Sequence, residues 1–505
     1  MAGTKRFAFN VVMNWIAVAV GMVVPFFLTP YVIKMLGVTA YGVWILAVST
    51  VAYLNILDMG LRSAIVRFVS KASAEDKPED ATAAVGAALW VRVLISAGIA
   101  VLSIILAFAF PHLFKIPHEL QRPAQITVLM CALGVAFTLV SGVFGAVLSA
   151  THRFDVLSGI SAMQTLARAG GVILILRSGH GLVPLAYWEM IIALLGGIAT
   201  VVAALKLYPP SRVRIARPDM DLLKTIGTYS FTTFVILVAV QIVMNTDNLV
   251  VGAFVSVAMV AFYSIGGSLM AYSWQVVTSV SATFTPLASG MEALGNMEGL
   301  QKLLLRGTQG TLGIALPISL ALTLRGKTFI GLWMGPQYSE ISGTVLQILL
   351  ISQFFGVANG TAGSIMTATD KHKPVAKCAV TEAILNISLS IALVKTIGIY
   401  GVAWGTSISM ALCHLVFWPP YVRKVLHIPV KRYLWEGWLK ITLCSIPYAI
   451  ACAATDRYWH ASNLIEFFLQ ITVILPVYAI CVVAVFRDEA RTLFQKWQAS
   501  RLVRA

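Results

Sequence analysis

The sequence predicts an all-α polytopic membrane protein with about 14 transmembrane helices. The chain of 505 residues is 58% hydrophobic and only 11% charged, whereas a soluble domain carries about 25% charged residues. Its mean hydropathy is +0.84. Polar and apolar residues do not alternate with a period of two, which argues against an outer-membrane barrel and leaves helices as the spanning structure. A water-soluble globular enzyme and a disordered protein are therefore excluded.

Fourteen apolar segments approach or exceed the length of about 20 residues that a spanning helix needs. They cover residues 8–34, 41–69, 81–109, 121–149, 155–176, 182–205, 222–245, 257–289, 302–324, 340–367, 375–397, 399–421, 433–454 and 462–486. The connections between them are too short for a soluble domain, and the first segment is too long for a cleaved signal peptide. We expect all fourteen to span the membrane.

The distribution of basic residues predicts the orientation. The net charge of +16 comes from 37 Lys and Arg against 21 Asp and Glu. With a cytoplasmic N-terminus, 26 of the 37 fall on the cytoplasmic side and 8 in outer loops, among them Arg325 and Lys327. Because cytoplasmic loops carry the excess of Lys and Arg, both termini are predicted to be cytoplasmic. The positive charge thus indicates membrane orientation, and no nucleic-acid partner is expected.

The basic connection at residues 206–221 divides the chain into two sets of six helices, followed by two more. We expect lobes at 1–215 and 216–430, with two extra helices and a basic tail at 431–505. A six-helix unit returns to its starting side of the membrane. The lobes are therefore predicted to be related by a pseudo-two-fold axis along the membrane normal.

Three arginines lie inside apolar segments, at Arg62, Arg92 and Arg168. A charge at bilayer depth costs several kcal/mol, about +2.5–3.5 on insertion scales, so it faces a partner or a wet cavity. Arg62 follows Asp58 by four residues with Asn55 on the same face, Arg168 follows Gln164 by four, and Arg92 has no acid nearby on its helix. We expect a cationic cavity that receives an anionic substrate. The alternative is an Asp58–Arg62 pair and an Arg168 that reaches the outer interface.

A second group of polar residues suits ion coupling. Its members are Gln241, Asn245 and Asp247 at the end of one segment, and Glu382 with Asn386 one turn later in another. Such groups carry protons or coordinate Na⁺ in transporters. The alternative is hydrogen bonding between helices. We expect no other cofactor, and the sequence leaves the choice of H⁺, Na⁺ or the membrane potential open.

Three other sequence features do not indicate a functional site. Gly326-Lys327-Thr328 resembles the end of a Walker A motif, but Ala321 replaces the first glycine and the site is predicted in an outer loop, which excludes nucleotide binding. The six cysteines lie in apolar segments without paired spacing, so no metal site is expected. His414, one turn before Trp418, is interpreted as a hydrogen-bonded histidine of the helix bundle.

Two runs carry a family resemblance. LGVTAYGVWILAVSTVAYLNILDMGLRSAIVRF (36–68) and NTDNLVVGAFVSVAMVAFYSIGG (245–267) resemble Wzx-type flippases. These form the polysaccharide transporter branch of the multidrug/oligosaccharidyl-lipid/polysaccharide (MOP) exporter superfamily. The matching positions are Asp58, Gly60, the stretch 62–67 and Asp247.

The resemblance implies a transporter, and no enzyme, in a bacterial inner membrane. Its substrate is implied to be a polyprenyl-diphosphate-linked oligosaccharide, moved to the outer leaflet by alternating access of two lobes around a cationic cavity. Membrane lipids, a polysaccharide polymerase and a chain-length regulator are the implied partners. Three alternatives remain: a lipid II flippase, a multidrug/cation antiporter of the same superfamily, and a membrane-bound polymerase or ligase.

Overall fold

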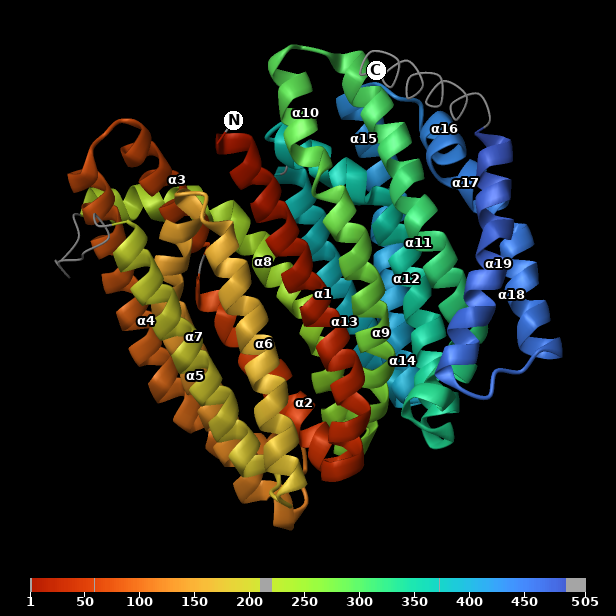
Figure 1. The fold of residues 1–505 in the computed structure, drawn as a ribbon, viewed down its shortest axis with the longest axis horizontal. Coiled ribbons are helices and arrows are strands. Elements are labelled where there is room, and N and C mark those ends of the chain that lie inside the picture. Colours follow the sequence, from red (N-terminus) through yellow and green to blue (C-terminus); the bar gives the residue numbers. More distant parts are fainter. Residues whose placement is uncertain (1, 59, 209–219, 372, 487–505) are drawn as a thin grey trace. The chain divides into compact units, whose positions relative to one another are not determined.

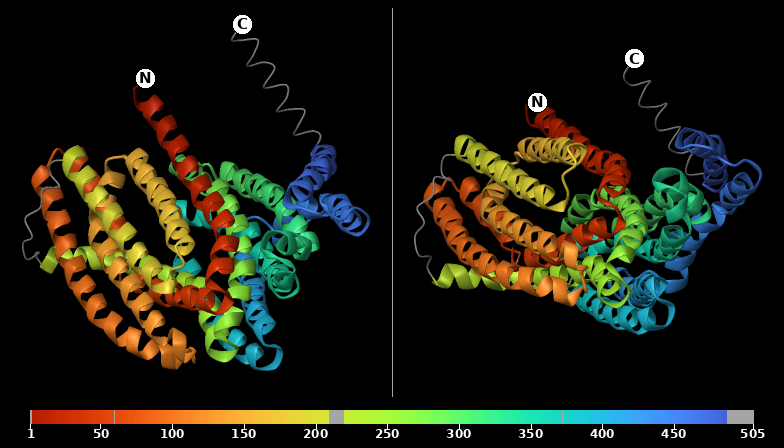
Figure 2. Two further views of the ribbon diagram at one scale, coloured as in Figure 1. Left: turned by 60° about the horizontal axis from the view of Figure 1, so that its bottom comes forward. Right: turned by 90° about the horizontal axis from the view of Figure 1, so that it is seen from below.

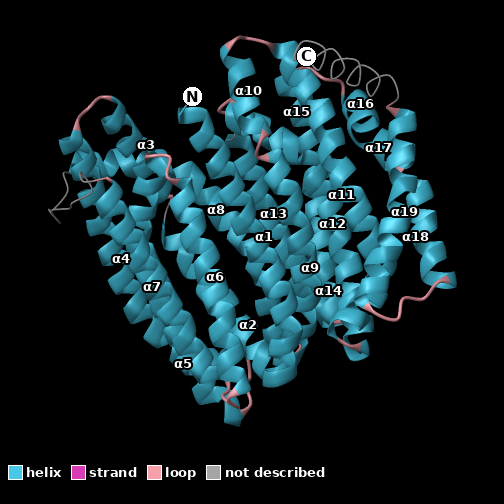
Figure 3. Ribbon diagram, in the orientation of Figure 1, coloured by secondary structure: helices cyan, strands magenta, loops and turns pink. Residues whose placement is uncertain are grey.

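A computed structural model describes residues 2–58, 60–208, 220–371 and 373–486. Within these ranges every regular element is a helix and no strand occurs (Figure 3). Fourteen helical stretches are long and apolar enough to cross a membrane. Large apolar side chains such as Phe27, Phe108 and Leu174 are exposed along them, as lipid-facing residues are. The predicted fold class, with its fourteen membrane helices, is confirmed.

The chain forms two compact units, residues 1–261 and 262–505, each described here by itself. The first holds α1 (Ala2–Leu36), α2 (Val38–Ala52), η1 (Tyr53–Asp58), α3 (Leu61–Ala74), α4 (Pro78–Leu113), α5 (His118–Ala150), α6 (Phe154–Arg177), α7 (Leu182–Leu207) and α8 (Met220–Phe254). α9 (Val257–Ser281) crosses the boundary. The predicted divisions at 215 and 430 concern an internal repeat, which packing units do not test, and they stay a prediction.

In the first unit, α5 packs between α4 and α7, and α6 joins α7 to α1 (Figures 1 and 2). Small residues allow the close approach of α5 and α7. A Cβ atom on Gly197 would lie 2.9 Å from the Ser141 hydroxyl oxygen, and one on Gly134 would lie 3.5 Å from the Ala193 Cβ. Small residues at membrane helix interfaces let backbones approach closely. The closely packed helices α5 and α7 thus form one side of the cavity described below.

The second membrane crossing is interrupted. A continuous helix over 41–69 is wrong, because α2 ends at Ala52, the tighter 3₁₀ helix η1 follows, and α3 starts at Leu61. Gly60 has φ +70°, a left-handed conformation that glycine adopts without steric cost. The break changes the partner of Asp58: its carboxylate pairs with Arg92 on α4, and the Asp58–Arg62 pair, given above as the alternative, is absent from the described contacts.

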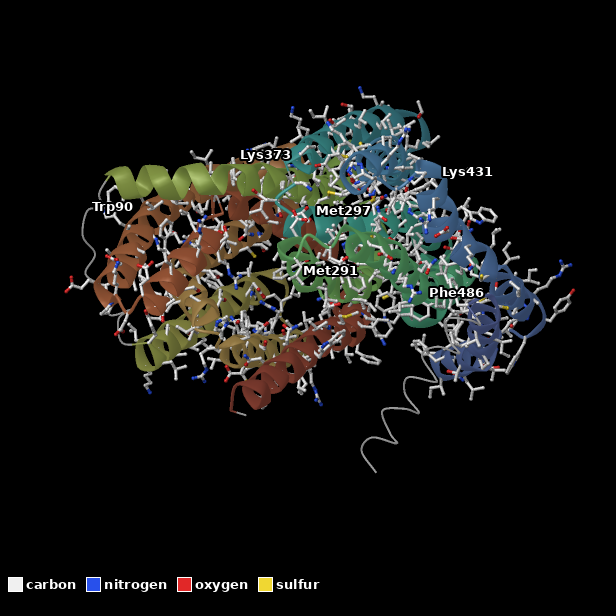
Figure 4. All side chains as sticks on the ribbon, turned by 90° about the horizontal axis from the view of Figure 1, so that it is seen from above. Trp90, Met291, Met297, Lys373, Lys431 and Phe486 are labelled. Atoms are coloured by element: carbon white, nitrogen blue, oxygen red, sulfur yellow. The ribbon has the colours of Figure 1, made fainter. Side chains whose placement is uncertain are left out.

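The second unit is built from helical hairpins around one core. It holds α10 (Phe284–Ala293), α11 (Met297–Met334), α12 (Pro336–Ala368), α13 (Lys373–Ile397), α14 (Ile399–Val416), α15 (Trp418–Leu426), α16 (Val430–Arg432), the π-helix η3 (Tyr433–Leu439), α17 (Lys440–Cys444), α18 (Ile446–Tyr458) and α19 (Leu464–Val485). α11 packs on α12, α13 on α14, and α18 on α19. Met291 and Met297 flank the α10–α11 connection and pack against the core (Figure 4).

The structure corrects the predicted outer loop at 325–339. α11 continues to Met334 and ends where Gly335, with φ +116°, turns the chain into Pro336 at the start of α12. Arg325 is therefore a helix residue and is completely buried. Lys327 lies in the same helix, where its ammonium donates to the Glu340 carboxylate at 2.7 Å.

Arg325 ties the last two helices to the second unit. Its guanidinium donates to Asp456 of α18 at 3.3 Å and to the amide oxygen of Gln470 of α19. It also lies 4.7 Å from the ring centre of Phe467, within cation–π range. Thr328 donates to the same Asp456 oxygen at 2.9 Å. A buried charge needs such partners, so this cluster fixes how α18 and α19 dock on α11.

Replacing Asp456 by Ala is expected to lower the stability of the second unit by about 3–5 kcal/mol, because it leaves a buried guanidinium without a counter-charge. The apparent melting temperature of the purified protein in detergent measures this. Arg457→Ala, a change at the exposed neighbour, serves as the control. The double variant Arg325→Met/Asp456→Ala should recover part of the loss, and a double variant less stable than Asp456→Ala would contradict the assignment.

Candidate functional site

The first unit contains a cavity of about 480 Å³ with a polar lining. Six of the eleven residues predicted for the site line it, from five different elements: Asn55, Asp58, Arg62, Arg92, Gln164 and Gln241. Hydroxyls from α5, α6 and α7 add to them, at Thr138, Ser141, Ser161 and Thr200. The structure thus brings together residues that the sequence separates by up to 186 positions.

Arg92 is the buried cation of this cavity, with 3% of its surface exposed. One guanidinium nitrogen donates to the Leu139 carbonyl at 2.6 Å and another pairs with the Asp58 carboxylate. Gly142 makes room for it, because a Cβ there would lie 2.6 Å from Nη1. Among the described residues, the Nε–H of Arg92 has no hydrogen-bond partner. One donor of a buried guanidinium is therefore left for a ligand or water.

Arg62 supplies the second cation. It lies on α3 one residue after the start of that helix, is exposed, and lines the cavity. No ion pair of the described residues involves it, and it lines the same cavity as Arg92. Two guanidinium groups and one carboxylate give the cavity a formal charge of +1. A planar guanidinium binds phosphate oxygens in pairs, so the arrangement suits a phosphate group.

Two glutamines contribute uncharged polar groups to the lining of the cavity. Gln164 on α6 donates to the Ile192 carbonyl at 3.1 Å, and Gln241 on α8 donates to the Ala52 carbonyl at 2.7 Å. Gln164 fits because position 196 on α7 is glycine, where any Cβ would overlap the amide. Both amides keep their oxygens available, as acceptors suited to sugar hydroxyls.

Arg168 is placed elsewhere. It does not line the cavity, and its guanidinium forms two parallel hydrogen bonds of 2.8 and 2.7 Å with the carboxylate of Glu189 on α7. The Trp188 indole donates to the Arg168 carbonyl at 3.3 Å beside them. Both charges of the pair are satisfied, so Arg168 joins α6 to α7 and leaves the cavity to Arg62 and Arg92.

The polar group at the end of α8 joins α8 to the second crossing. Asn248 donates to Ser49 at 3.0 Å, and the Thr246 and Tyr53 hydroxyls lie 2.5 Å apart. Asn245 donates to the Gln241 carbonyl at 3.2 Å. Asp247 is buried, with 6% of its surface exposed, next to these contacts. Neither Asn245 nor Asp247 lines the cavity.

Glu382 and Asn386 belong to the second unit, on α13. Asn386 is fully buried and donates to the Thr406 hydroxyl of α14 at 2.8 Å. Glu382 lies 3.5 Å from the imidazole Nε2 of His414. The sequence alone does not join His414 to Glu382, because the two residues lie 32 positions apart and meet only when α13 and α14 fold into a hairpin. A histidine and an acid in two consecutive apolar segments are the signal that could have found this contact.

A family model described as "Polysaccharide biosynthesis protein" matches residues 32–343, more than half of the chain. This chain belongs to that family. Among curated relatives, the uncharacterized membrane protein EpsK of Bacillus subtilis is 26% identical over 83% of this chain and 84% of its own. The putative O-antigen transporter of Shigella flexneri is 21% identical over 78% and 92%, and the probable flippase AglR of Haloferax volcanii is 23% identical over 76% and 77%.

Solved structures show the same fold. The inward closed conformation of the lipid II flippase MurJ aligns with a TM-score of 0.75, 17% identity, 95% of this chain and 99% of its own. An inward-facing multidrug resistance MATE transporter of the MOP superfamily aligns with a TM-score of 0.70, 14% identity, 83% and 98%. The resemblance to the polysaccharide transporters of this superfamily, stated from the sequence, is confirmed. This polysaccharide biosynthesis protein is a multi-pass membrane protein with the MOP transporter fold.

Asp58→Asn is expected to tighten anion binding in the cavity, because it raises the formal charge from +1 to +2 and keeps an oxygen for Arg92. Inorganic pyrophosphate, titrated into the purified protein, is the probe. The gain should be about 1.5–3 kcal/mol, the usual contribution of a hydrogen bond to a charged group, or roughly ten- to hundredfold in Kd. Asp155→Asn, which breaks a pair with Arg153 outside the cavity, should leave the Kd unchanged. Weaker binding by Asp58→Asn contradicts this account of the charge.

Proposed function

We propose that this family member is a flippase that moves a polyprenyl-diphosphate-linked oligosaccharide from the cytoplasmic to the outer leaflet of a bacterial inner membrane. The substrate is a repeat unit for O-antigen, exopolysaccharide or capsule synthesis, and transport proceeds by alternating access. The names of the relatives as flippases and transporters, none of them an enzyme, support this. The single structural observation that carries it is the +1 cavity around Arg62 and Arg92.

The polar cavity would lower the free-energy cost of moving the polar substrate across the membrane. A diphosphate and a sugar chain must cross about 30 Å of hydrocarbon, where each unpaired polar group is costly. Arg62 offers its guanidinium to one phosphate. Arg92 offers its unpaired Nε–H, and an incoming phosphate oxygen can replace the Asp58 oxygen as its partner. Gln164, Gln241 and Asn55 are placed to bind sugar hydroxyls, while the polyprenyl tail stays in lipid.

The alternatives are weaker. A multidrug antiporter for cations needs anionic groups, whereas this cavity carries net positive charge. A polysaccharide polymerase or ligase of the usual kind has a large outer loop or catalytic domain, and the described connections are short. A lipid II flippase would use the same diphosphate site. Complementation of a strain that lacks its lipid II flippase separates that substrate from surface polysaccharide units. A polymerase and a chain-length regulator are the proposed partners.

Arg62→Gln is expected to lower surface-polysaccharide output in the producing bacterium by roughly ten- to hundredfold at normal protein abundance. The change removes one charge-assisted phosphate contact of about 1.5–3 kcal/mol and no packing contact. Arg177→Gln, an exposed arginine in the last turn of α6, is the matched control and should retain full output. Full output from both Arg62→Gln and Arg92→Ala at native expression would falsify the cationic site.

The proposed topology has both termini in the cytoplasm. Five of the six native cysteines are buried, so single added cysteines report with little background. A cysteine at position 424, exposed in α15, or in the connection 206–221, whose residues 209–219 lie outside the described ranges, should react with an impermeant maleimide only in permeabilised cells. A cysteine at the exposed His180 should react in intact cells. The reverse pattern would overturn the orientation.

A further inference from the structure

We propose that Glu382 and His414 together bind one proton in the second unit, and that this proton couples transport to the pH gradient. The carboxylate Oε2 of Glu382 on α13 lies 3.5 Å from the imidazole Nε2 of His414 on α14. Each side chain is 12% exposed, and both lie in helices that are candidate membrane spans. The pair is therefore largely shielded from solvent but retains some exposed surface, through which a proton can reach it.

The surroundings of the other imidazole nitrogen suit a group that changes protonation state. His414 Nδ1 lies 3.2 Å from the amide nitrogen of Asn359, a donor, and 3.1 Å from the Phe355 carbonyl, an acceptor. The Asn359 amide is oriented by Tyr433, whose hydroxyl donates to the Asn359 oxygen at 3.1 Å. The imidazole nitrogen thus finds a partner with or without a proton.

Two satisfied states follow from this geometry. In the first, His414 is neutral with its proton on Nε2, which faces the Glu382 carboxylate, while Nδ1 accepts from Asn359; the pair carries a charge of −1. In the second, a proton from water is bound at Nδ1, which donates to the Phe355 carbonyl, and the pair is a neutral ion pair. The imidazole Nδ1 has a partner in both states, and in the second state the Asn359 amide keeps its hydrogen bond of 3.1 Å to the Phe355 carbonyl. The imidazole therefore avoids the cost of about 1–3 kcal/mol that an unpartnered buried group incurs.

Among the described residues, the other titratable side chains around the pair are two thiols and a phenol. Cys378 on α13 and Cys413 on α14 adjoin Glu382, Tyr433 reaches the site from η3, and the Trp418 ring on α15 lies 6.2 Å from the imidazole. Thiols and phenols are ordinarily protonated at pH 7. The bound proton therefore decides whether this part of the second unit is charged or neutral.

This charge difference gives a means of coupling, which rests on the proposed function. Enclosing a net charge away from water costs more than enclosing a neutral pair. The empty transporter should therefore return to its cytoplasm-facing state most readily with the proton bound. Proton uptake from the outside and release to the cytoplasm would then drive the anionic lipid outward. The proton site itself does not depend on the identity of the transported lipid.

The first test measures the proton site alone. Nuclear magnetic resonance of the full-length protein with ¹⁵N-labelled histidine reports the tautomer and charge of His414, assigned from its loss in His414→Gln. Glu382→Gln should lower the pH midpoint of imidazolium formation, because the cation loses its anion. Asn359→Leu should raise the midpoint, because the neutral imidazole loses its donor. Glu340→Gln, an exposed acid of the same unit, should leave it unchanged.

Shifts of the pH midpoint in opposite directions in the two variants support the proton site. If one variant does not fold, the predicted shift in the other is a sufficient test. An imidazole that keeps one protonation state across the folded pH range overturns it, as do equal shifts in the two variants. A merely structural role for Glu382 moves stability and leaves the midpoint in place.

The second test measures coupling in proteoliposomes, with a fluorescent polyprenyl-diphosphate disaccharide as the probe. The probe should accumulate in the leaflet that faces the acidic side, by about tenfold per pH unit for one proton per cycle. Glu382→Gln should make accumulation independent of the gradient, while Glu340→Gln keeps the dependence. Wild-type flipping that ignores the gradient overturns the coupling. No flipping under any condition overturns the proposed function, and the resonance test of the proton site still stands.

Discussion

The free-energy cost of placing a charge in a low-dielectric bilayer constrains both units of this protein. A guanidinium at that depth persists only when a carboxylate, an amide or water in a cavity meets it. Arg168 meets Glu189 and Arg325 meets Asp456, each from a neighbouring helix. These pairs hold helices together and leave nothing for a substrate. Arg62 lacks such a partner among the described residues and is exposed, which is why we propose that the cavity binds the substrate.

The break in the second membrane crossing explains why Arg62 lacks an ion-pair partner among the described residues, whereas Arg168 and Arg325 have one. Had the helix continued through residues 53–60, Asp58 and Arg62 would lie one turn apart and neutralise each other. The 3₁₀ segment and the left-handed Gly60 direct Asp58 to Arg92 and leave Arg62 facing the cavity. A short irregular segment at membrane depth is tolerated where it lines a cavity. The same segment therefore supplies both the irregular backbone and the polar lining of the site.

Hydrophobicity and charge counts predicted the helices well, because spanning length and loop charge are local properties of the chain. They could not locate helix ends that bury a charge. Arg325 looked like a loop residue beside Lys327, and only the contacts with α18 and α19 show why the helix continues. In the same way, the sequence placed Arg62, Arg92 and Arg168 together in one predicted cationic cavity. Their partners lie on other helices, so the distinction between a salt bridge and an open cation required the three-dimensional arrangement.

The two proposed sites contain different kinds of ionisable group, and the difference matches the two tasks of the coupled transporter that we propose. Arginine keeps its charge at any physiological pH, so the cavity of Arg62 and Arg92 stays attractive to a diphosphate whatever the pH on either side of the membrane. Histidine changes its charge near neutral pH, and His414 has a donor and an acceptor ready for both forms. A titratable group in the cavity would lose its hold on the substrate whenever it lost its proton. Separate groups for binding the anion and for binding the proton avoid that conflict, so the proton can change the access of the site without changing its affinity for phosphate.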